Sequence, residues 1–273
     1  MKNLYFLKQP TNMYPRTLVK SFITGAEIGI PLNIFSNVYT QMHYGYDIIT
    51  IKPIILQFLL SYYAYGYDRL KDADEYESDP NLYNNLSQKK LELYNNIINN
   101  KKIYELSFFV TEISILSLLL LNDNYITILP FIPLLLTSRY YKEFKQNLSF
   151  YKPLYISFMW TMSSVILPCV LYDNNYSILL SPQDYLPCLL LLFATSNYAD
   201  IKDIKEDTLN NIETIPVKFG IDKSNFISLI ALAISSILFV ESSNFVNRPI
   251  INSLVEIQNF GLMYLLYNSS FID

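Results

Sequence analysis

The chain has 273 residues, of which 51% are hydrophobic and 16% are charged, and its mean hydropathy is +0.20. A soluble protein of this size needs more polar surface, so the composition argues against that class and predicts a protein that spans a membrane several times. A net charge of −4 excludes binding to nucleic acid through general basicity.

Apolar runs that could cross, or nearly cross, a bilayer follow one another along the chain. They predict an all-α, multi-spanning bundle of eight transmembrane helices in a single domain, residues 1–273. The runs cover residues 17–39, 48–65, 104–121, 125–138, 153–172, 185–197, 224–241 and 249–268. The Asn-rich segment 82–100 predicts a short cap helix over the site, with a disordered loop as the alternative.

The basic residues are divided unevenly between the two sides of this bundle. If the helices alternate in direction, all twenty Lys and Arg residues except Lys52 and Arg248 fall on one side. That side also receives the long polar loops and the cap segment. By the positive-inside rule it faces the cytoplasm, or the stroma or matrix of an organelle, so the sequence predicts an integral, multi-pass membrane protein.

Three aspartates follow the sixth apolar run on that side. On a helix Asp200, Asp203 and Asp207 fall within about 60° of one another and line one face. Carboxylates so close repel each other, and we expect a cation among them. Oxygen ligands without nearby His or Cys favour Mg²⁺, which shares its shell with phosphate oxygens. The alternative is a solvated helix end with alternating Asp and Lys.

A second acidic segment, residues 67–80, ends the second apolar run on the same side. Within it, Asp68 and Asp72 lie one helical turn apart and form a second candidate pair of metal ligands. Ionisable residues at the mouth of a helical bundle are candidates for function. We therefore expect the two acidic segments, which are distant in sequence, to face one shared cavity.

The loop 138–152 lies between the acidic segments and contains tyrosines and lysines, among them Tyr140, Lys145 and Lys152. These residues could clamp a phosphate opposite the metal ions, or they could anchor a helix end at the membrane interface. The single histidine, His43, lies on the opposite side, so imidazole catalysis is unsupported. No glycine-rich nucleotide loop is present.

These features resemble the UbiA superfamily of intramembrane prenyltransferases. The family has two aspartate-rich motifs at the cytoplasmic ends of its second and sixth helices. Asp200 and the two aspartates after it match the second motif in full, and residues 214–220 are similar to its continuation into Thr, Pro, Val and Gly. Asp68-Arg69-Leu70-Lys71-Asp72 resembles the core of the first motif, with Ala64 where the family has Asn. The family usually has nine helices, one more than the eight runs found here.

The resemblance implies Mg²⁺-dependent transfer of a polyprenyl group from a polyprenyl diphosphate to an acceptor in the membrane. The acceptor would be an aromatic ring, a quinone precursor, a porphyrin or a lipid alcohol. The implied metal ligands are Asp68, Asp72, Asp200, Asp203 and Asp207. The implied diphosphate-binding residues are Arg16, Lys145, Lys152 and Asn197. Tyr140 would donate to the leaving group or face the allylic cation. The implied catalytic residues are Asp68, Asp72, Asp200, Asp203, Tyr140 and Lys145.

Three other functions remain compatible with the same residues. An enzyme of this fold could cyclise the prenyl diphosphate as a terpene synthase without any acceptor. A transport protein could use the acidic segments as a path for cations, although such a path would carry carboxylates at mid-membrane. A degenerate relative, suggested by Ala64, would bind Mg²⁺ and diphosphate without turnover.

Overall fold

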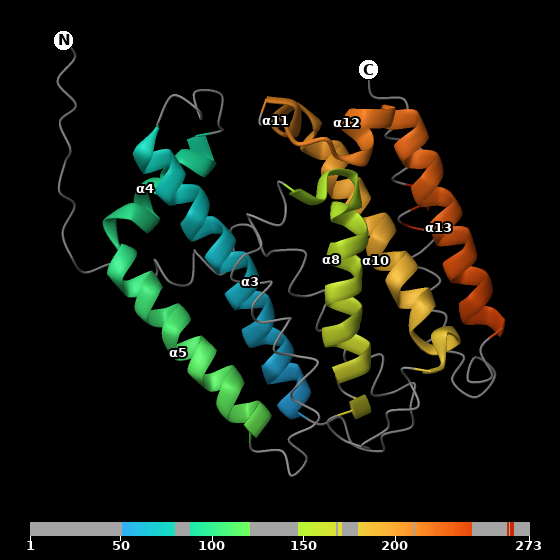
Figure 1. The fold of residues 1–273 in the computed structure, drawn as a ribbon, viewed down its shortest axis with the longest axis horizontal. Coiled ribbons are helices and arrows are strands. Elements are labelled where there is room, and N and C mark those ends of the chain that lie inside the picture. The colour runs from blue at the N-terminus through green and yellow to red at the C-terminus, as the bar shows by residue number, and fades with distance from the viewer. Residues whose placement is uncertain are drawn as a thin grey trace.

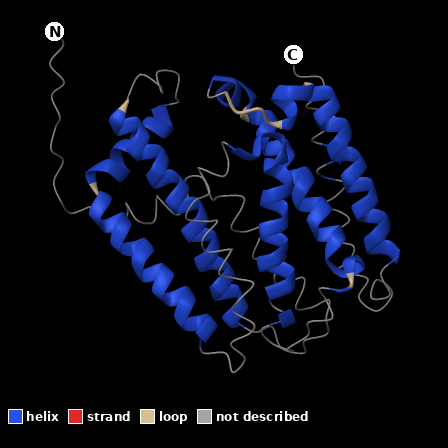
Figure 2. Ribbon diagram, in the orientation of Figure 1, coloured by secondary structure: helices blue, strands red, loops and turns tan. Residues whose placement is uncertain are grey.

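A computed structural model of the chain describes residues 51–79, 88–120, 147–170 except 168, 180–241 except 210, and residues 261, 263 and 264. Every regular element in these residues is a helix (Figure 2). The all-α prediction is therefore confirmed for the described part of the chain. The apolar runs 17–39 and 125–138, and nearly all of 249–268, lie outside it.

The long helices pack side by side and alternate in direction (Figure 1). They are α3 (Ile51–Ser78), α5 (Lys101–Leu120), α8 (Lys152–Thr161, continued by a π-helical turn at Met162–Ile166), α10 (Pro182–Lys202) and α13 (Ile221–Glu241). The shorter elements are α4 (Gln88–Asn99), a 3₁₀ turn (Ser149–Tyr151), α11 (Ile204–Leu209) and α12 (Ile215–Phe219). The ends of α3 and α10 and the starts of α8 and α13 lie towards the upper end of the bundle in Figure 1, and α5 begins lower, below α4.

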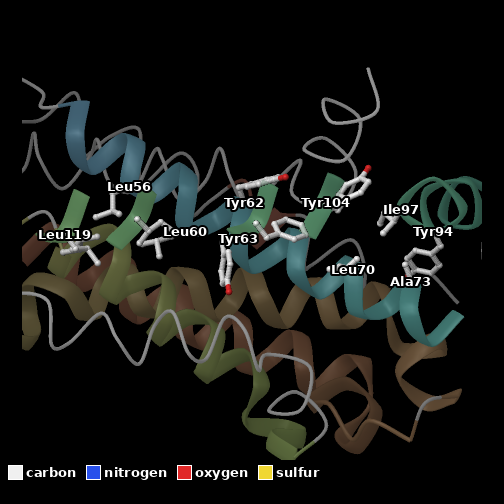
Figure 3. Packing of buried hydrophobic residues seen from close by; sticks show 13 residues of the cluster. Leu56, Leu60, Tyr62, Tyr63, Leu70, Ala73, Tyr94, Ile97, Tyr104 and Leu119 are labelled. Carbon is white, nitrogen blue, oxygen red and sulfur yellow. The ribbon is translucent and has the colours of Figure 1, made fainter. Parts of the chain in front are cut away.

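Helix α3 continues 13 residues beyond the predicted apolar run 48–65. Its extension is stabilised by α4, which forms within the expected cap segment 82–100. Tyr94 and Ile97 of α4 are buried with Leu70 and Ala73 of α3 in one apolar cluster (Figure 3). Because one side of the extension is covered, the acidic residues from Asp68 to Glu77 belong to the helix rather than to a loop after it.

Helix α5 packs against α3 around residues 62–67, where the extension begins, through an aromatic cluster. The ring of Phe108 lies with its centroid 5.4–6.4 Å from four tyrosine rings, those of Tyr62, Tyr63, Tyr67 and Tyr104. Gly66 permits this approach, since a Cβ atom there would lie 2.5 Å from Cε1 of Phe108. The missing side chain at one position of α3 thus sets how closely α5 docks.

The polarity of α13 is the reverse of that of a helix on a soluble protein. Its buried side carries the serines Ser224, Ser228 and Ser235 beside Ala231 and Leu232. Its exposed side carries the large apolar residues Phe226, Ile230, Ile234 and Ile237. Small and polar residues between helices, with apolar residues outside, are typical of helix packing in membranes, where lipid surrounds the bundle.

Among the described helices, α5 and the Ile221–Phe239 part of α13 are long and apolar enough to cross a membrane by length and composition. The core helix of a soluble protein would also pass this criterion, but it would be mostly buried. Only 28% of the apolar window of α5 and 33% of that of α13 is buried. The exposed surface of α5 is formed by Leu106, Phe109, Val110, Ile113, Leu116 and Leu120.

The described Lys and Arg residues follow the predicted division between the two ends. Apart from Lys52 in the first turn of α3, they belong to the upper half of α3, to α4, to the first turn of α5, or to the helix ends and short helices at the upper end in Figure 1. Helices α3 and α10 run towards that end and α5, α8 and α13 run away from it, which are the directions that the sequence argument assumed for these five.

Candidate functional site

A buried lysine lies between two buried aspartates where α8, α10 and α11 meet. Nζ of Lys152 is 2.5 Å from Oδ1 of Asp200 and 4.0 Å from Oδ2 of Asp207. The exposed fractions of the three residues are 5%, 2% and 3%. Charged groups as deeply buried as these are retained in proteins only when they are paired or bound to an ion, so this triad is the centre of the candidate site.

Local backbone structure holds Lys152 in this position. Lys152 is the first residue of α8 and is followed by Pro153, which is tolerated there because the first turn needs no backbone donor. Just before it, Oγ of Ser149 donates a hydrogen bond of 2.8 Å to the carbonyl of Glu213. The Ile212 N–H in turn donates to the carbonyl of Asp207. The start of α8 is thus hydrogen-bonded to the segment that follows Asp207.

The three aspartates of the second motif do not share one helix. Helix α10 ends at Lys202, Asp203 is its C-cap, and α11 begins at Ile204. Asp200 and Asp207 meet the same lysine, as two residues seven positions apart on one helical face would, whereas Asp203 is exposed. The expectation that all three aspartates line one continuous helical face therefore differs from the structure at Asp203, where the helix is interrupted.

The first acidic pair has different neighbours. Oδ2 of Asp72 lies 3.2 Å from Nη1 of Arg69 and accepts a hydrogen bond of 3.4 Å from the hydroxyl of Tyr94. Burial is the largest single influence on the pKa of the Arg69 guanidinium and lowers it, but Asp72, Asp68 and Tyr94 together raise that pKa by more, so it lies above its ordinary value. Asp72 is thus held between its own helix and the cap helix α4.

Helix α8 contacts both of the helices that carry the acidic residues, α3 and α10. The ring of Trp160 in α8 stacks on Tyr65 of α3, with the centroids 5.5 Å apart. Nearer the lower end, the amide of Gln57 donates to Oγ of Ser163. Since Asp68 follows Tyr65 by three residues, it lies within about 60° of the α3 face that touches α8. In Figure 1 the end of α10 lies beside the start of α8, whereas α3 leans away from α8 towards its upper end.

Asn197 is buried between α10 and α13. Its amide nitrogen lies 2.8 Å from Oγ of Ser224, 2.7 Å from Oγ of Ser228 and 3.0 Å from the Ser224 carbonyl oxygen. Its carbonyl oxygen lies 3.1 Å from Oγ of Ser224, which donates to it. Because Asn197 stands one turn before Asp200, these hydrogen bonds fix the height and rotation of the helix end that carries the aspartate.

Three of the predicted site residues, Arg16, Tyr140 and Lys145, lie outside the described residues. Their roles remain predictions from the sequence. Within the described residues the structure brings Lys152, Asp200 and Asp207 together, and it connects Asp72 to Arg69 and Tyr94.

The oxygen donors of the site fit the chemistry of Mg²⁺. Asp200 and Asp207 offer carboxylate oxygens on two sides of the Lys152 ammonium group. Asp68 and Asp72 of α3 offer a second pair of carboxylates. The described part of the chain contains no group of three or more His, Cys, Asp or Glu side chains arranged to hold an ion. A Mg²⁺ ion at either pair would complete its shell with water and phosphate oxygens, which is its usual behaviour.

A pocket of about 10 Å³ lies on another face of α3, towards α4 and α5. It is lined by Tyr62, Gly66, Arg69, Leu93, Ile97, Tyr104 and Phe108. Small-molecule sites commonly enclose about 300–1,000 Å³, so this pocket is far too small for a prenyl donor. It is also separated from the Lys152 triad by α3 itself.

The sequence identified the charged residues of the site but not the residues that they or Asn197 contact. Ser224 and Ser228 are four residues apart in an apolar run, a spacing of small residues that is typical of membrane helix contacts. Lys152 stands at a helix N-terminus, where the helix dipole disfavours a cation. That misfit was a signal that the lysine is held there by carboxylates from elsewhere in the chain.

Comparisons with protein-family models, with curated proteins and with solved structures find no match to this chain.

Proposed function

We propose that the chain is a multi-pass membrane prenyltransferase of the UbiA type. It would transfer a polyprenyl group from its diphosphate to an acceptor within the bilayer, with Mg²⁺ as cofactor. The observation that carries the proposal is the buried triad of Lys152, Asp200 and Asp207 at the end of the bundle where the acidic part of α3 also lies.

The exposed apolar surfaces support the membrane location. Helices α5 and α13 expose large apolar residues on the sides that face away from the bundle, and α13 buries serines. This arrangement is stable when lipid is the solvent and costly when water is. The concentration of basic residues at the end of the bundle that carries the site supports a cytoplasmic or equivalent orientation.

The roles of the residues follow from their chemistry. The carboxylates of Asp68, Asp72, Asp200 and Asp207 supply hard oxygen ligands at the membrane surface. When bound, Mg²⁺ would neutralise the negative charge that grows on the departing diphosphate. Lys152 supplies an ammonium group beside Asp200 and Asp207, and in a low-dielectric surrounding its attraction for the diphosphate is strong. The apolar helices exclude water, which would otherwise react with the prenyl cation.

The test is a turnover assay with the purified full-length chain. Labelled farnesyl or geranylgeranyl diphosphate, Mg²⁺ and candidate acceptors should give diphosphate release and a prenylated product. Asp200→Ala and Asp68→Ala should abolish turnover while the far-ultraviolet circular dichroism remains that of the wild type.

Asp74→Ala is the matched control, because it removes a carboxylate of the same acidic segment that is half-exposed and paired with Lys101. It should retain activity. Full activity in Asp200→Ala or Asp68→Ala would remove that residue from the mechanism. Hydrocarbon formed without an acceptor would identify a cyclase instead, and binding without any turnover would identify a degenerate binding protein.

A further inference from the structure

The ammonium group of Lys152 stands where a divalent cation of the site would have to stand. It touches Oδ1 of Asp200 at 2.5 Å and lies 4.0 Å from Oδ2 of Asp207. A Mg²⁺ ion binds carboxylate oxygens at about 2.1 Å. An ion bound to that Asp200 oxygen on the side of Asp207 would therefore be in contact with Nζ, and two cations in contact in a buried site repel strongly. The lysine and the metal are thus alternatives at the same carboxylate oxygen of Asp200.

We propose that Lys152 is an exchangeable counter-ion: it pairs with Asp200 and Asp207 in the metal-free protein, and a divalent cation displaces it, freeing its ammonium group to pair with the incoming anion. The identity of that anion as a diphosphate rests on the proposed function. The exchange would make Mg²⁺ bind weakly alone and more tightly together with the diphosphate, since the anion gives the displaced lysine a new partner.

The first test uses the wild-type protein and measures the access of an amine-acylating reagent to individual lysines by peptide mass spectrometry. In EDTA, Lys152 is buried and paired and should react slowly, whereas the exposed Lys223 should react fast. Saturating Mg²⁺ alone should raise the labelling of Lys152 severalfold and leave Lys223 unchanged. Unchanged labelling of Lys152, with Mg²⁺ binding shown by calorimetry, would overturn the exchange.

The second test removes the competing cation. Lys152→Met should bind Mg²⁺ alone roughly tenfold or more tightly than the wild type, because the ion no longer displaces a buried partner. The variant should unfold at a lower temperature than the wild type in EDTA, and Mg²⁺ should restore much of the difference. Lys152→Arg, which keeps the charge, should show neither the tighter binding nor the rescue.

The outcomes separate this inference from the proposed function. A wild-type protein that binds Mg²⁺ and turns over prenyl diphosphate, with no gain of affinity in Lys152→Met, refutes the exchange alone. A Lys152→Met variant that stays unfolded in Mg²⁺ also refutes it, since the metal then cannot take the place of the lysine. A wild-type protein that binds no Mg²⁺, with or without pyrophosphate, refutes both.

Discussion

Replacing Asn197 with Ala tests whether this residue holds two helices together or contacts the substrate. The sequence predicted a diphosphate contact, whereas in the structure its amide is hydrogen-bonded to Ser224 and Ser228 of α13. All three side chains are 0% exposed. If these bonds define its role, Asn197→Ala must weaken the association of α10 with α13.

The magnitude follows from the number of bonds. The amide nitrogen has two hydrogens to donate, and hydrogen bonds between membrane helices contribute about 0.6 kcal/mol on average and about 1.7 kcal/mol at most. Two such bonds give about 1.2 kcal/mol, and the stranded serine hydroxyls add to this, although each can turn to a carbonyl of its own helix. We expect Asn197→Ala to lower the free energy of unfolding by about 2 kcal/mol.

The assay is reversible unfolding in mixed detergent micelles, followed by circular dichroism. A double-mutant cycle with Ser228→Ala should give a coupling energy of about 0.5 kcal/mol or more. The exposed Asn95→Ala in α4 is the matched control and should change stability by less than about 0.5 kcal/mol. Asn197→Ala with wild-type stability and weakened pyrophosphate binding would refute the reasoning and restore the substrate contact.

Three further variants test other parts of the structure. Gly66→Ala places a Cβ atom 2.5 Å from Phe108 Cε1, an overlap costing about 1–3 kcal/mol that a gain of about 1 kcal/mol in helix propensity only partly offsets. The unfolding temperature should fall and recover with Phe108→Leu; an unchanged temperature would contradict the close packing of α5 on α3. Ile230→Lys, at the exposed centre of α13, should reduce insertion by about 3 kcal/mol in a translocon assay, and full insertion would argue for a water-exposed surface. Asp74→Ala breaks a pair with Lys101 that is more than a third exposed, so stability should fall by less than about 1 kcal/mol in the same unfolding assay; a larger loss would show a stronger structural role for this pair.

The apolar runs predicted the existence and approximate position of the long helices in the described part of the chain. They did so because a long, nearly continuous apolar run leaves a strong signal in one sequence. The boundaries were less well predicted where a neighbour changes the environment. Helix α3 extends past its apolar run because α4 covers one side of it.

Sequence by itself determined which residues could carry charge at the end of the bundle, since the positions of Asp68, Asp200 and Asp207 after apolar runs follow from the order of residues alone. Only the tertiary structure decided which charges meet. Asp200 and Asp207 meet Lys152 of α8, whereas Asp203, which stands between them in the sequence, is exposed. Such a pairing depends on contacts between residues some 50 positions apart, and helical periodicity describes only neighbours within a few turns.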